Sequence, residues 1–534
     1  MVLERYPRAP SATGRNGGAV PGLTAAVAGQ ERVAIGGKPL SFEDLRAVAR
    51  GARVSLASDV PARVAPSRAL IEKVLKQGST VYGVNTGFGQ LKSVRIQDQD
   101  VEKLQINLIR SHAAGSGPEL ESGVVRLMLA LRAHSLALGY SGVRLTLLEH
   151  FVRMLEANIL PVVPSRGSLG ASGDLIPLAH LALGLIGEGE VRVDGRLAST
   201  SDLMRGNGMA PLTLQAKEGL ALINGTQAMT SVGALALIEA AEVLRAAHLA
   251  CALSVDAARA SVKPFDPRVH AIRPHAGQMR SAAALWGLLR GSGIVASHES
   301  CAKVQDPYSL RCAPQVLGAS IAAFRHARET VVTEVNSVSD NPLCFADTGE
   351  VISAGNFHGE PVAQALDFLA IGMAEVGSIS ERRTFLLLDT TKSGLPAFLS
   401  PSAGLRSGLM IVQYLQAALV SENRMLAQPA STDSIPTSAG QEDHVSMGMH
   451  AAIKALTLVR NVRRIVAAEL LCAAQGIHLL RPLRSSEPLE RVLARLHEKV
   501  PPLDEDRRQD HDLDRLDEWI ASGAPADLAG IEAF

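Results

Sequence analysis

The sequence predicts a large, mainly α-helical protein, and three observations lead to this prediction. Alanine and leucine, which are both strong helix formers, fill most of the long apolar windows. Hydrophobic residues make up 47% of the 534-residue chain but aromatic residues only 3%, which is unlike the composition of a β-sandwich. In the second half, apolar residues recur at spacings of three and four over long segments, as in helices buried inside a bundle.

The balance of charges excludes several classes of protein. The chain has 53 Lys and Arg against 53 Asp and Glu, which argues against an electrostatic nucleic-acid binder or a polybasic membrane anchor.

Its five cysteines are far apart and form no CxxC pair, which argues against a disulfide framework and for a reducing compartment. The first residues lack the apolar region of a signal peptide, and no uncharged apolar run reaches eighteen residues. We therefore expect a cytoplasmic protein.

Shorter, mixed elements are predicted for the first part of the chain. Residues 1–30 are rich in Gly, Pro and Ala without periodicity, which predicts a disordered tail. A hairpin is predicted around Gly36-Gly37, and Ser41-Phe-Glu-Asp44 resembles a capping box that opens a helix. Further helices are expected at 66–77, 99–112 and 119–158, and a second hairpin at 189–196.

Long helices dominate the second half. We expect them at 216–258, 278–291, 313–338, 358–384, 404–425 and 445–476. The charged segment 484–520 is typical of a solvated helical cap. The predicted organisation is a disordered tail (1–30), an N-terminal domain (31–215), a long-helix bundle core (216–480) and a C-terminal helical cap (481–534).

The most unusual stretch is 167–180, with three glycines between a proline-rich approach and an apolar run. Clustered small residues indicate that the backbone bends sharply or comes very close to something. No lysine follows as in a P-loop, and the glycine spacing does not fit Gly-x-Ser-x-Gly. One alternative is a plain tight turn before a buried helix. The other is a backbone that reacts: the Gly173 nitrogen attacks the Ala171 carbonyl and, with loss of water and Ser172 becoming dehydroalanine, leaves an electrophilic five-membered ring.

Short polar inserts interrupt the long helices. A helical core does not need polar side chains at its breaks, because buried polar groups must find partners. A single insert is most simply a loop or a cap, whereas several that line one place indicate a site, since catalytic groups favour loops on rigid scaffolds. The inserts are 223–227, 305–311, 336–342, 355–359 and 441–444, and the glycine-rich loop 82–89 interrupts the first half in the same way.

Together these stretches resemble the aromatic amino acid ammonia-lyase family, from about residue 33 to 510. The motifs are the Tyr82 loop, Gly170-Ala-Ser-Gly-Asp174, the Asn224 loop, Tyr308 to Arg311, Asn356-Phe-His358 and Gln441-Glu-Asp-His444. The resemblance implies that Ala171, Ser172 and Gly173 cyclise to 4-methylidene-imidazol-5-one (MIO). In this group Ala171 is cross-linked to Gly173, and Ser172 becomes a didehydroalanine. No external cofactor or metal is expected. It also implies a long central helical bundle, a smaller mixed N-terminal part that carries the MIO, and a homotetramer with shared active sites.

The resemblance implies a role for each remaining site residue. Tyr82 is expected to take the β-proton, which requires that its surroundings, including the N–H groups of its glycine loop, lower its pKa. Arg311 is expected to clamp the substrate carboxylate through its forked guanidinium. Tyr308 is expected to orient the adduct or assist proton transfer, and Asn224 to hold the MIO oxygen or the substrate amine. Phe357 is expected to stack near the ring, and Gln305 to form hydrogen bonds within the site. The division of labour between Tyr82, Tyr308 and Glu442 stays open.

Two positions bear on the substrate. Ser111-His112 and Glu442 resemble the histidine branch of the family, whereas phenylalanine-type members tend to carry Gln in place of Glu442. A carboxylate can accept an imidazole N–H and His112 could bind the other ring nitrogen, but a phenyl ring would leave the carboxylate unpaired. The resemblance therefore implies L-histidine as substrate, with trans-urocanate and ammonia as products. Ala313 and Ser168-Leu169 depart from the residues common in that branch.

Alternative functions use the same motifs. An aminomutase would keep the MIO and return ammonia to the β-carbon, and a phenylalanine or tyrosine ammonia-lyase would change only the substrate. A catalytically inactive helical scaffold would be expected to lack some of Ser172, Tyr82, Tyr308 and Arg311, but all four are present. The 15 histidines show no HExxH spacing, so a metal enzyme is not supported. The expected partners are a small-molecule substrate and further copies of the chain, with no nucleic acid and no membrane.

Overall fold

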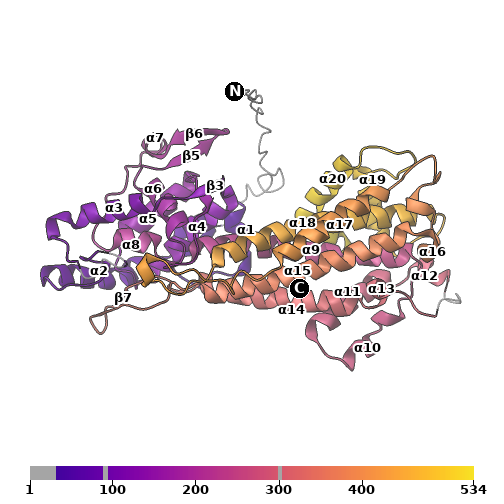
Figure 1. The fold of residues 1–534 in the computed structure, drawn as a ribbon, viewed down its shortest axis with the longest axis horizontal. Helices are drawn as coiled ribbons and strands as arrows, with labels where there is room; N and C mark the ends of the chain where they lie inside the picture. Colours follow the sequence, from indigo (N-terminus) through magenta and orange to yellow (C-terminus); the bar gives the residue numbers. More distant parts are fainter. Residues whose placement is uncertain (1–31, 88, 90–93, 299–303) are drawn as a thin grey trace, which may run out of the picture.

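The structure is a computed structural model that describes residues 32–87, 89, 94–298 and 304–534. The predicted disordered tail, residues 1–30, lies outside the described residues. Most of the chain forms a bundle of long helices, and a smaller group of short helices and strands lies at one end of it (Figure 1). This arrangement confirms the mainly α-helical fold class.

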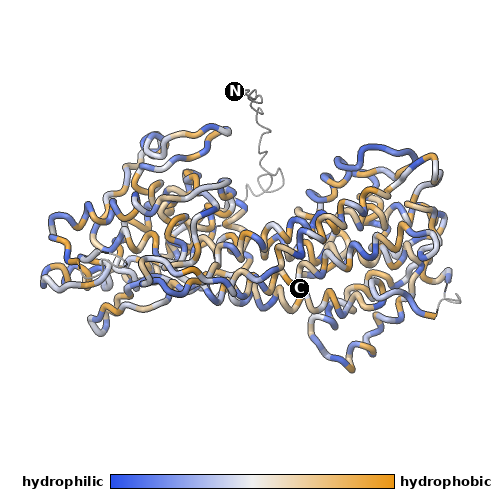
Figure 2. The backbone as a smooth tube through the Cα atoms, viewed as in Figure 1, coloured by the Kyte–Doolittle hydropathy of each residue, from blue (hydrophilic) through white to orange (hydrophobic). Residues whose placement is uncertain are grey.

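Three long helices form the centre of the bundle: α9 (Gln227–Ala257), α15 (Glu360–Leu388) and α18 (Gly448–Leu479). α14 (Ala313–Val335) packs on α15 and α9, and α17 (Met410–Leu426) packs on α18 and α15. Hydrophobic residues are dense along these helices (Figure 2), and nearly all of α9 is buried. Among the described helices α15 alone is long and apolar enough to cross a membrane, and 67% of its most apolar window is buried inside the protein.

The predicted capping box is confirmed at the start of α1 (Phe42–Ala49). The Asp44 N–H donates to the Ser41 hydroxyl over 3.1 Å, and the Ser41 N–H donates to Asp44 Oδ2 over 2.8 Å. Two donors that the first helical turn leaves without partners are satisfied in this way, so the helix begins where the sequence indicates.

The predicted hairpin around Gly36-Gly37 is wrong. β1 (Arg32–Ile35) pairs in parallel with β2 (Arg53–Leu56), and α1 connects the two strands. Gly36 has a φ of +76°, and a Cβ there would lie 2.5 Å from the Cβ of Ala137. The glycine therefore lets the chain pass close to a buried helix and turn towards α1, instead of folding back on the preceding strand.

The remaining elements of the N-terminal part are α2 (Val60–Lys76), a 3-10 turn (Asp98–Asp100), α3 (Val101–His112), β3 (Ser116–Glu119), α4 (Ser122–Ala137), α5 (Leu145–Glu156), β4 (Pro164–Arg166), α6 (Leu175–Leu185), β5 (Glu190–Val193), β6 (Arg196–Ser199), α7 (Thr200–Gly206) and α8 (Glu218–Ile223). β5 and β6 form the predicted second hairpin. The helix predicted over 119–158 is two helices, because Gly139 and Gly142 adopt positive φ between them. The segment 216–258 is also divided, at Asn224 to Thr226, and this break builds the site described below.

The other elements of the second half are mostly short. They are α10 (Pro267–Ala271), α11 (Ala276–Leu289), α12 (Gly293–Ala296), α13 (Tyr308–Arg311), β7 (Leu343–Phe345), β8 (Glu350–Ile352), α16 (Thr390–Ser393), α19 (Glu487–Lys499), α20 (Asp510–Ala521), α21 (Ala524–Ala529) and 3-10 turns at Lys263–Phe265, Ala397–Leu399 and Ser438–Gly440. α20 packs on α18 and α9, and α21 packs on α9 and α19. In Figure 1, α10, α12, α13 and α16 lie at the end of the bundle that is distant from the N-terminal part.

Candidate active site

Residues 170–173 form a tight turn just before α6. The Gly173 N–H donates to the Gly170 carbonyl over 3.3 Å, which leaves Ala171 and Ser172 at the tip of the turn. Ser172 has a φ of +50° and Gly173 a φ of +77°. A Cβ on Gly173 would lie 2.2 Å from the carbonyl oxygen of Gly225, so only glycine fits there. A sharply bent Ala-Ser-Gly with an unhindered glycine nitrogen suits the ring closure that the sequence predicts.

Asp174 ties this turn to the start of α9. Its N–H donates to the Gly225 carbonyl over 2.7 Å, and its carboxylate accepts the Met229 N–H over 2.7 Å and the Ser168 hydroxyl over 2.8 Å. Burial raises the pKa of Asp174 to about 7, although these hydrogen bonds favour the charged form. No role was predicted for Asp174, whose only signal in the sequence is its place at the end of the Ala-Ser-Gly motif.

Glu442 lies beside the tip of the turn. The Ser172 hydroxyl donates to Glu442 Oε1 over 3.3 Å, and the Thr437 hydroxyl donates to Glu442 Oε2 over 2.7 Å. The Thr437 N–H also donates to the Glu442 carbonyl over 2.9 Å, so the loop that carries the carboxylate is closed on itself. A negative charge therefore faces the side chain from which the predicted electrophile would derive.

Tyr82 is close enough to Glu442 for the carboxylate to act on it. Burial raises the pKa of Tyr82 above its ordinary value, and the Glu442 charge raises it further. A hydrogen bond with the Gly89 backbone lowers it, so the glycine loop acts in the predicted direction. The prediction that the Tyr82 pKa is lowered overall is nevertheless wrong for a single chain. Burial and the Glu442 charge raise this pKa by more than the hydrogen bond with the loop lowers it.

His112 is the last residue of α3. Burial lowers the pKa of His112 by more than the charge of Glu442 raises it, so the ring is neutral near pH 7. Its Nδ1 lies 2.8 Å from the Leu108 carbonyl oxygen. Because a carbonyl only accepts, Nδ1 carries the hydrogen and Nε2 is left as an acceptor.

Asn224 and Phe357 lie at the same end of the bundle. Asn224 is buried at the end of α8, and its side-chain amide donates to the Asn341 carbonyl over 2.9 Å. Phe357 is half-buried and closely precedes Gly359, where a Cβ would lie 2.4 Å from Sδ of Met229. The loop of Phe357 therefore packs on the start of α9, beside the glycine turn.

Gln305, Tyr308 and Arg311 are not brought to this place, because they lie at the opposite end of the bundle (Figure 1). The Ser261 N–H, just beyond the end of α9, donates to Asp306 Oδ2 over 2.7 Å, whereas the glycine turn packs on the segment just before α9. α9 has 31 residues and is therefore about 46 Å long at 1.5 Å per residue. One chain thus holds two separate groups of predicted residues.

We name these groups by their place. The glycine-turn group is Tyr82, His112, Ala171, Ser172, Gly173, Asn224, Phe357 and Glu442, and the α13 group is Gln305, Tyr308 and Arg311. In the α13 group, Arg311 Nε donates to the Asp306 carbonyl over 2.9 Å and Nη2 donates to Gln305 Oε1 over 3.2 Å. The guanidinium carbon lies 4.5 Å from the centre of the Tyr308 ring, and Tyr308 is 70% exposed. The α13 group therefore presents an exposed phenol and, stacked on it, a half-buried guanidinium.

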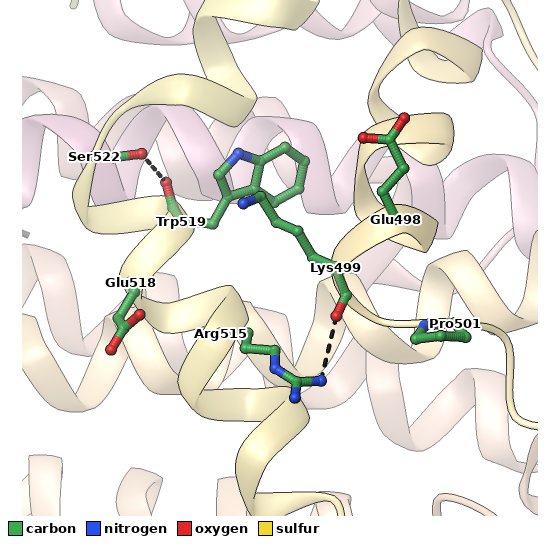
Figure 3. Close-up of a pocket in the computed structure, with 7 residues that line it drawn as sticks. All are labelled: Glu498, Lys499, Pro501, Arg515, Glu518, Trp519 and Ser522. Carbon is green, nitrogen blue, oxygen red and sulfur yellow. Dashed lines mark hydrogen bonds between the residues drawn. The ribbon is translucent and has the colours of Figure 1, made fainter.

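No group of three or more His, Cys, Asp or Glu side chains suited to a metal occurs within the described parts of the chain. A surface cavity lies between α19 and α20 and contains none of the predicted site residues (Figure 3). The Lys499 ammonium lies 6.0 Å from the centre of the Trp519 ring, and Arg515 donates to the Lys499 carbonyl over 3.4 Å. Glu498 and Glu518 also line the cavity, so that charges of both signs are present there, as is typical of a solvated surface.

Comparisons with known proteins place this geometry in context. The model of the aromatic amino acid lyase family matches residues 40–498. The histidine ammonia-lyase of Anaeromyxobacter dehalogenans (strain 2CP-C) is 50% identical over 504 residues, which cover 92% of this chain and 99% of that protein. The structure of histidine ammonia-lyase from Trypanosoma cruzi is similar with a TM-score of 0.87 at 44% identity, over 94% of this chain and 95% of that one. Tyrosine aminomutase from Streptomyces globisporus has a TM-score of 0.89 at 37% identity, over 94% and 99%.

Proposed function

This chain belongs to the aromatic amino acid lyase family, and we propose that it eliminates ammonia from L-histidine to give trans-urocanate. The observation that carries the choice of substrate is the Glu442 carboxylate, held 3.3 Å from the Ser172 hydroxyl. A carboxylate at this position can accept an imidazole N–H, whereas an apolar ring would leave it desolvated and unpaired. The names of the relatives at 50% and 44% identity support the same substrate.

Ala171, Ser172 and Gly173 are proposed to carry an MIO. The positive φ of Ser172 and the absence of room for a Cβ on Gly173 support this assignment, because ring closure needs a bent tripeptide that ends in glycine. When formed, the group supplies an electrophilic carbon to which the substrate amine adds, so that a poor leaving group becomes a better one.

Tyr82 is the proposed base for the β-proton. Its raised pKa in the single chain means that a positive charge has to approach before it can act near neutral pH. The half-buried Arg311 of another copy of the chain could supply that charge while it binds the substrate carboxylate. The proton transfer and the carboxylate clamp would then depend on the same contact between chains.

Glu442 and His112 are proposed to hold the substrate imidazole. The free ring nitrogen of His112 is an acceptor, and the Glu442 carboxylate also accepts. Two acceptors suit a ring that offers two N–H groups. An imidazolium has both of these N–H groups, whereas a phenyl ring has none. This pair therefore favours histidine over phenylalanine.

The proposed assembly is a homotetramer in which the α13 group of one chain faces the glycine-turn group of another. The separation of about 46 Å along α9 supports this arrangement, because one substrate cannot contact both groups of the same chain. Exposed apolar side chains along the bundle also favour association, among them Phe368 on α15 at 54% exposure and Tyr414 on α17 at 59%.

Product identification tests the proposal. The purified protein is incubated separately with L-histidine, L-phenylalanine and L-tyrosine, and each product is identified by mass, with Ser172→Ala as the control. Urocanate from histidine alone is expected, and none from the Ser172→Ala protein, whose fold and assembly should be unchanged. A β-amino acid would instead indicate an aminomutase, and cinnamate or coumarate without urocanate would overturn the choice of substrate.

A further inference from the structure

Gly225, which presses on Gly173, is itself enclosed by buried polar side chains. A Cβ on Gly225 would lie 2.4 Å from Nη1 of Arg132, 2.5 Å from Oε1 of Gln227 and 2.9 Å from Oγ of Ser339. These three residues come from α4, from the start of α9 and from the segment before β7. We call them the Arg132 cluster. The peptide of Gly225 is therefore held between this cluster on one side and the Ala-Ser-Gly turn on the other.

The Arg132 cluster is linked by hydrogen bonds. Arg132 Nη1 donates to Gln227 Oε1 over 2.6 Å, and Gln227 Nε2 donates to Ser339 Oγ over 2.8 Å. The N–H of Thr226, the residue after Gly225, lies 3.5 Å from the same hydroxyl. All three side chains are buried, so a lost partner cannot be replaced by bulk water.

Arg132 also explains why the chain breaks between α8 and α9. Its Nε donates to the Ala221 carbonyl over 2.8 Å, and Nη2 donates to the same oxygen. α8 ends at Ile223, so this carbonyl is one of those that a helix end leaves without a partner. Asp340 Oδ1 lies 4.0 Å from the guanidinium, and the same carboxylate accepts from the buried Lys217 ammonium over 2.7 Å. Burial lowers the pKa of Arg132 to about 10, so the guanidinium remains charged near neutral pH.

We propose that the Arg132 cluster is a positioning device for ring closure at Ala171-Ser172-Gly173. This inference rests on the proposed function, because it assumes that the ring forms. The cluster touches none of the reacting atoms. It fixes the Gly225 carbonyl, which accepts the Asp174 N–H over 2.7 Å and so holds the glycine end of the turn.

The chemistry shows why position matters. The Gly173 nitrogen forms a bond to the Ala171 carbonyl carbon, and the Ala171 oxygen leaves as water with the amide hydrogens of Gly173 and Ser172. Ser172 then loses its hydroxyl and its Cα hydrogen as a second water, so no oxidant or reductant is required. An amide nitrogen is a weak nucleophile, and such an attack is fast only when the reacting atoms are held close together.

Substitution of Arg132 by methionine tests the proposal, with Arg126→Met as a matched control. Arg126 is another buried arginine of α4, but it donates to the Val48 and Ala52 carbonyls and to the Asn158 side chain, away from the turn. Ring content is read from the mass of the tryptic peptide 167–192, which loses two waters when the ring closes. The wild-type protein is measured first, because a peptide without this loss would overturn the proposed MIO itself.

In the folded full-length protein, Arg132→Met is expected to reduce ring content about tenfold, whereas Arg126→Met should keep full ring content even if it is less stable. Arg132→Lys, which keeps the charge, should recover part of the ring. If Arg132→Met does not fold, Gln227→Met and Ser339→Ala remove the same hydrogen bonds with less disturbance, and slower ring closure after refolding is expected. The inference would be overturned if the folded Arg132→Met protein had the ring content and the rate of ring closure of the wild type. The same result in both Gln227→Met and Ser339→Ala would also overturn it.

Discussion

Two inactive variants of this chain should restore activity when they assemble together. Ser172→Ala disables the glycine-turn group, and Arg311→Ala disables the α13 group. The two groups lie at opposite ends of α9, about 46 Å apart at 1.5 Å per residue, which is too far for one small substrate. In the proposed assembly an active site therefore takes one group from each of two chains.

The size of the effect follows from counting sites. In assemblies formed at random from equal amounts of both variants, a site is intact when its glycine turn comes from an Arg311→Ala chain and its α13 group from a Ser172→Ala chain. Each condition is met half of the time, so about a quarter of the sites and about a quarter of the wild-type kcat are expected for a symmetric assembly. The KM of those sites should equal that of the wild type, because every residue in them is native.

The assay uses co-expression of the two variants with different affinity tags and purification over both tags. Urocanate formation is then compared with that of each variant alone. Ser172→Ala combined with Glu442→Ala is the control, because these side chains touch within one chain and both changes disable the same group. The control pair should stay inactive. An inactive mixture of Ser172→Ala and Arg311→Ala, recovered as a mixed assembly, would refute the shared site.

Three further predictions concern single substitutions. Gly173→Ala should prevent ring closure, measured by peptide mass, because a Cβ would lie 2.2 Å from a backbone oxygen at a φ that also costs an L-residue about 1–2 kcal/mol. Glu442→Gln should lower the pKa of Tyr82, because it removes a charge that raises it, so the alkaline rise of kcat/KM should move to lower pH. Glu469→Gln should lower the free energy of unfolding by about 3–5 kcal/mol, because Arg383, paired with it at 2.5 Å, would be left buried without its counter-charge.

Each of these substitutions has a control and an outcome that would contradict it. Gly206→Ala adds a Cβ with nothing within 4 Å and should leave ring content unchanged, and a closed ring in the Gly173→Ala protein would contradict the steric argument. An alkaline limb that does not move in Glu442→Gln would mean that Tyr82 is not the base. Glu487→Gln breaks an exposed pair with Arg491 and should cost less than about 1 kcal/mol, so an equal loss in both Glu→Gln variants would contradict the role of burial.

Features with local signals could be predicted from the sequence. The capping box at Ser41 depends on residues three apart, and the hairpin at 189–196 depends on a turn between adjacent strands. The false hairpin at Gly36-Gly37 had a similar turn signal, but its strand pairs with residues 53–56, on the far side of a helix. Pairing at that distance depends on how α1 packs, which a turn motif does not specify.

The members of the candidate site could also be named from sequence motifs, but not their arrangement. The motifs that contain Ser172 and Arg311 do not indicate that the 31-residue helix α9 separates the two residues in space. The direction of the Tyr82 pKa depends on burial and on the charge of Glu442, which comes from a segment 360 positions later in the chain. The Arg132 cluster escaped notice because Arg132, Gln227 and Ser339 belong to three segments far apart in the sequence, and no motif links them before they meet around one glycine.

Release of ammonia from L-histidine tests the proposed reaction itself. The purified wild-type protein, with nothing added but the substrate, is compared with the Ser172→Ala protein at equal concentration. We expect one ammonia for each urocanate from the wild type and none from Ser172→Ala. Wild-type protein that releases no ammonia from L-histidine would refute the proposed activity, and a Ser172→Ala protein that releases it at the wild-type rate would refute the role of Ser172.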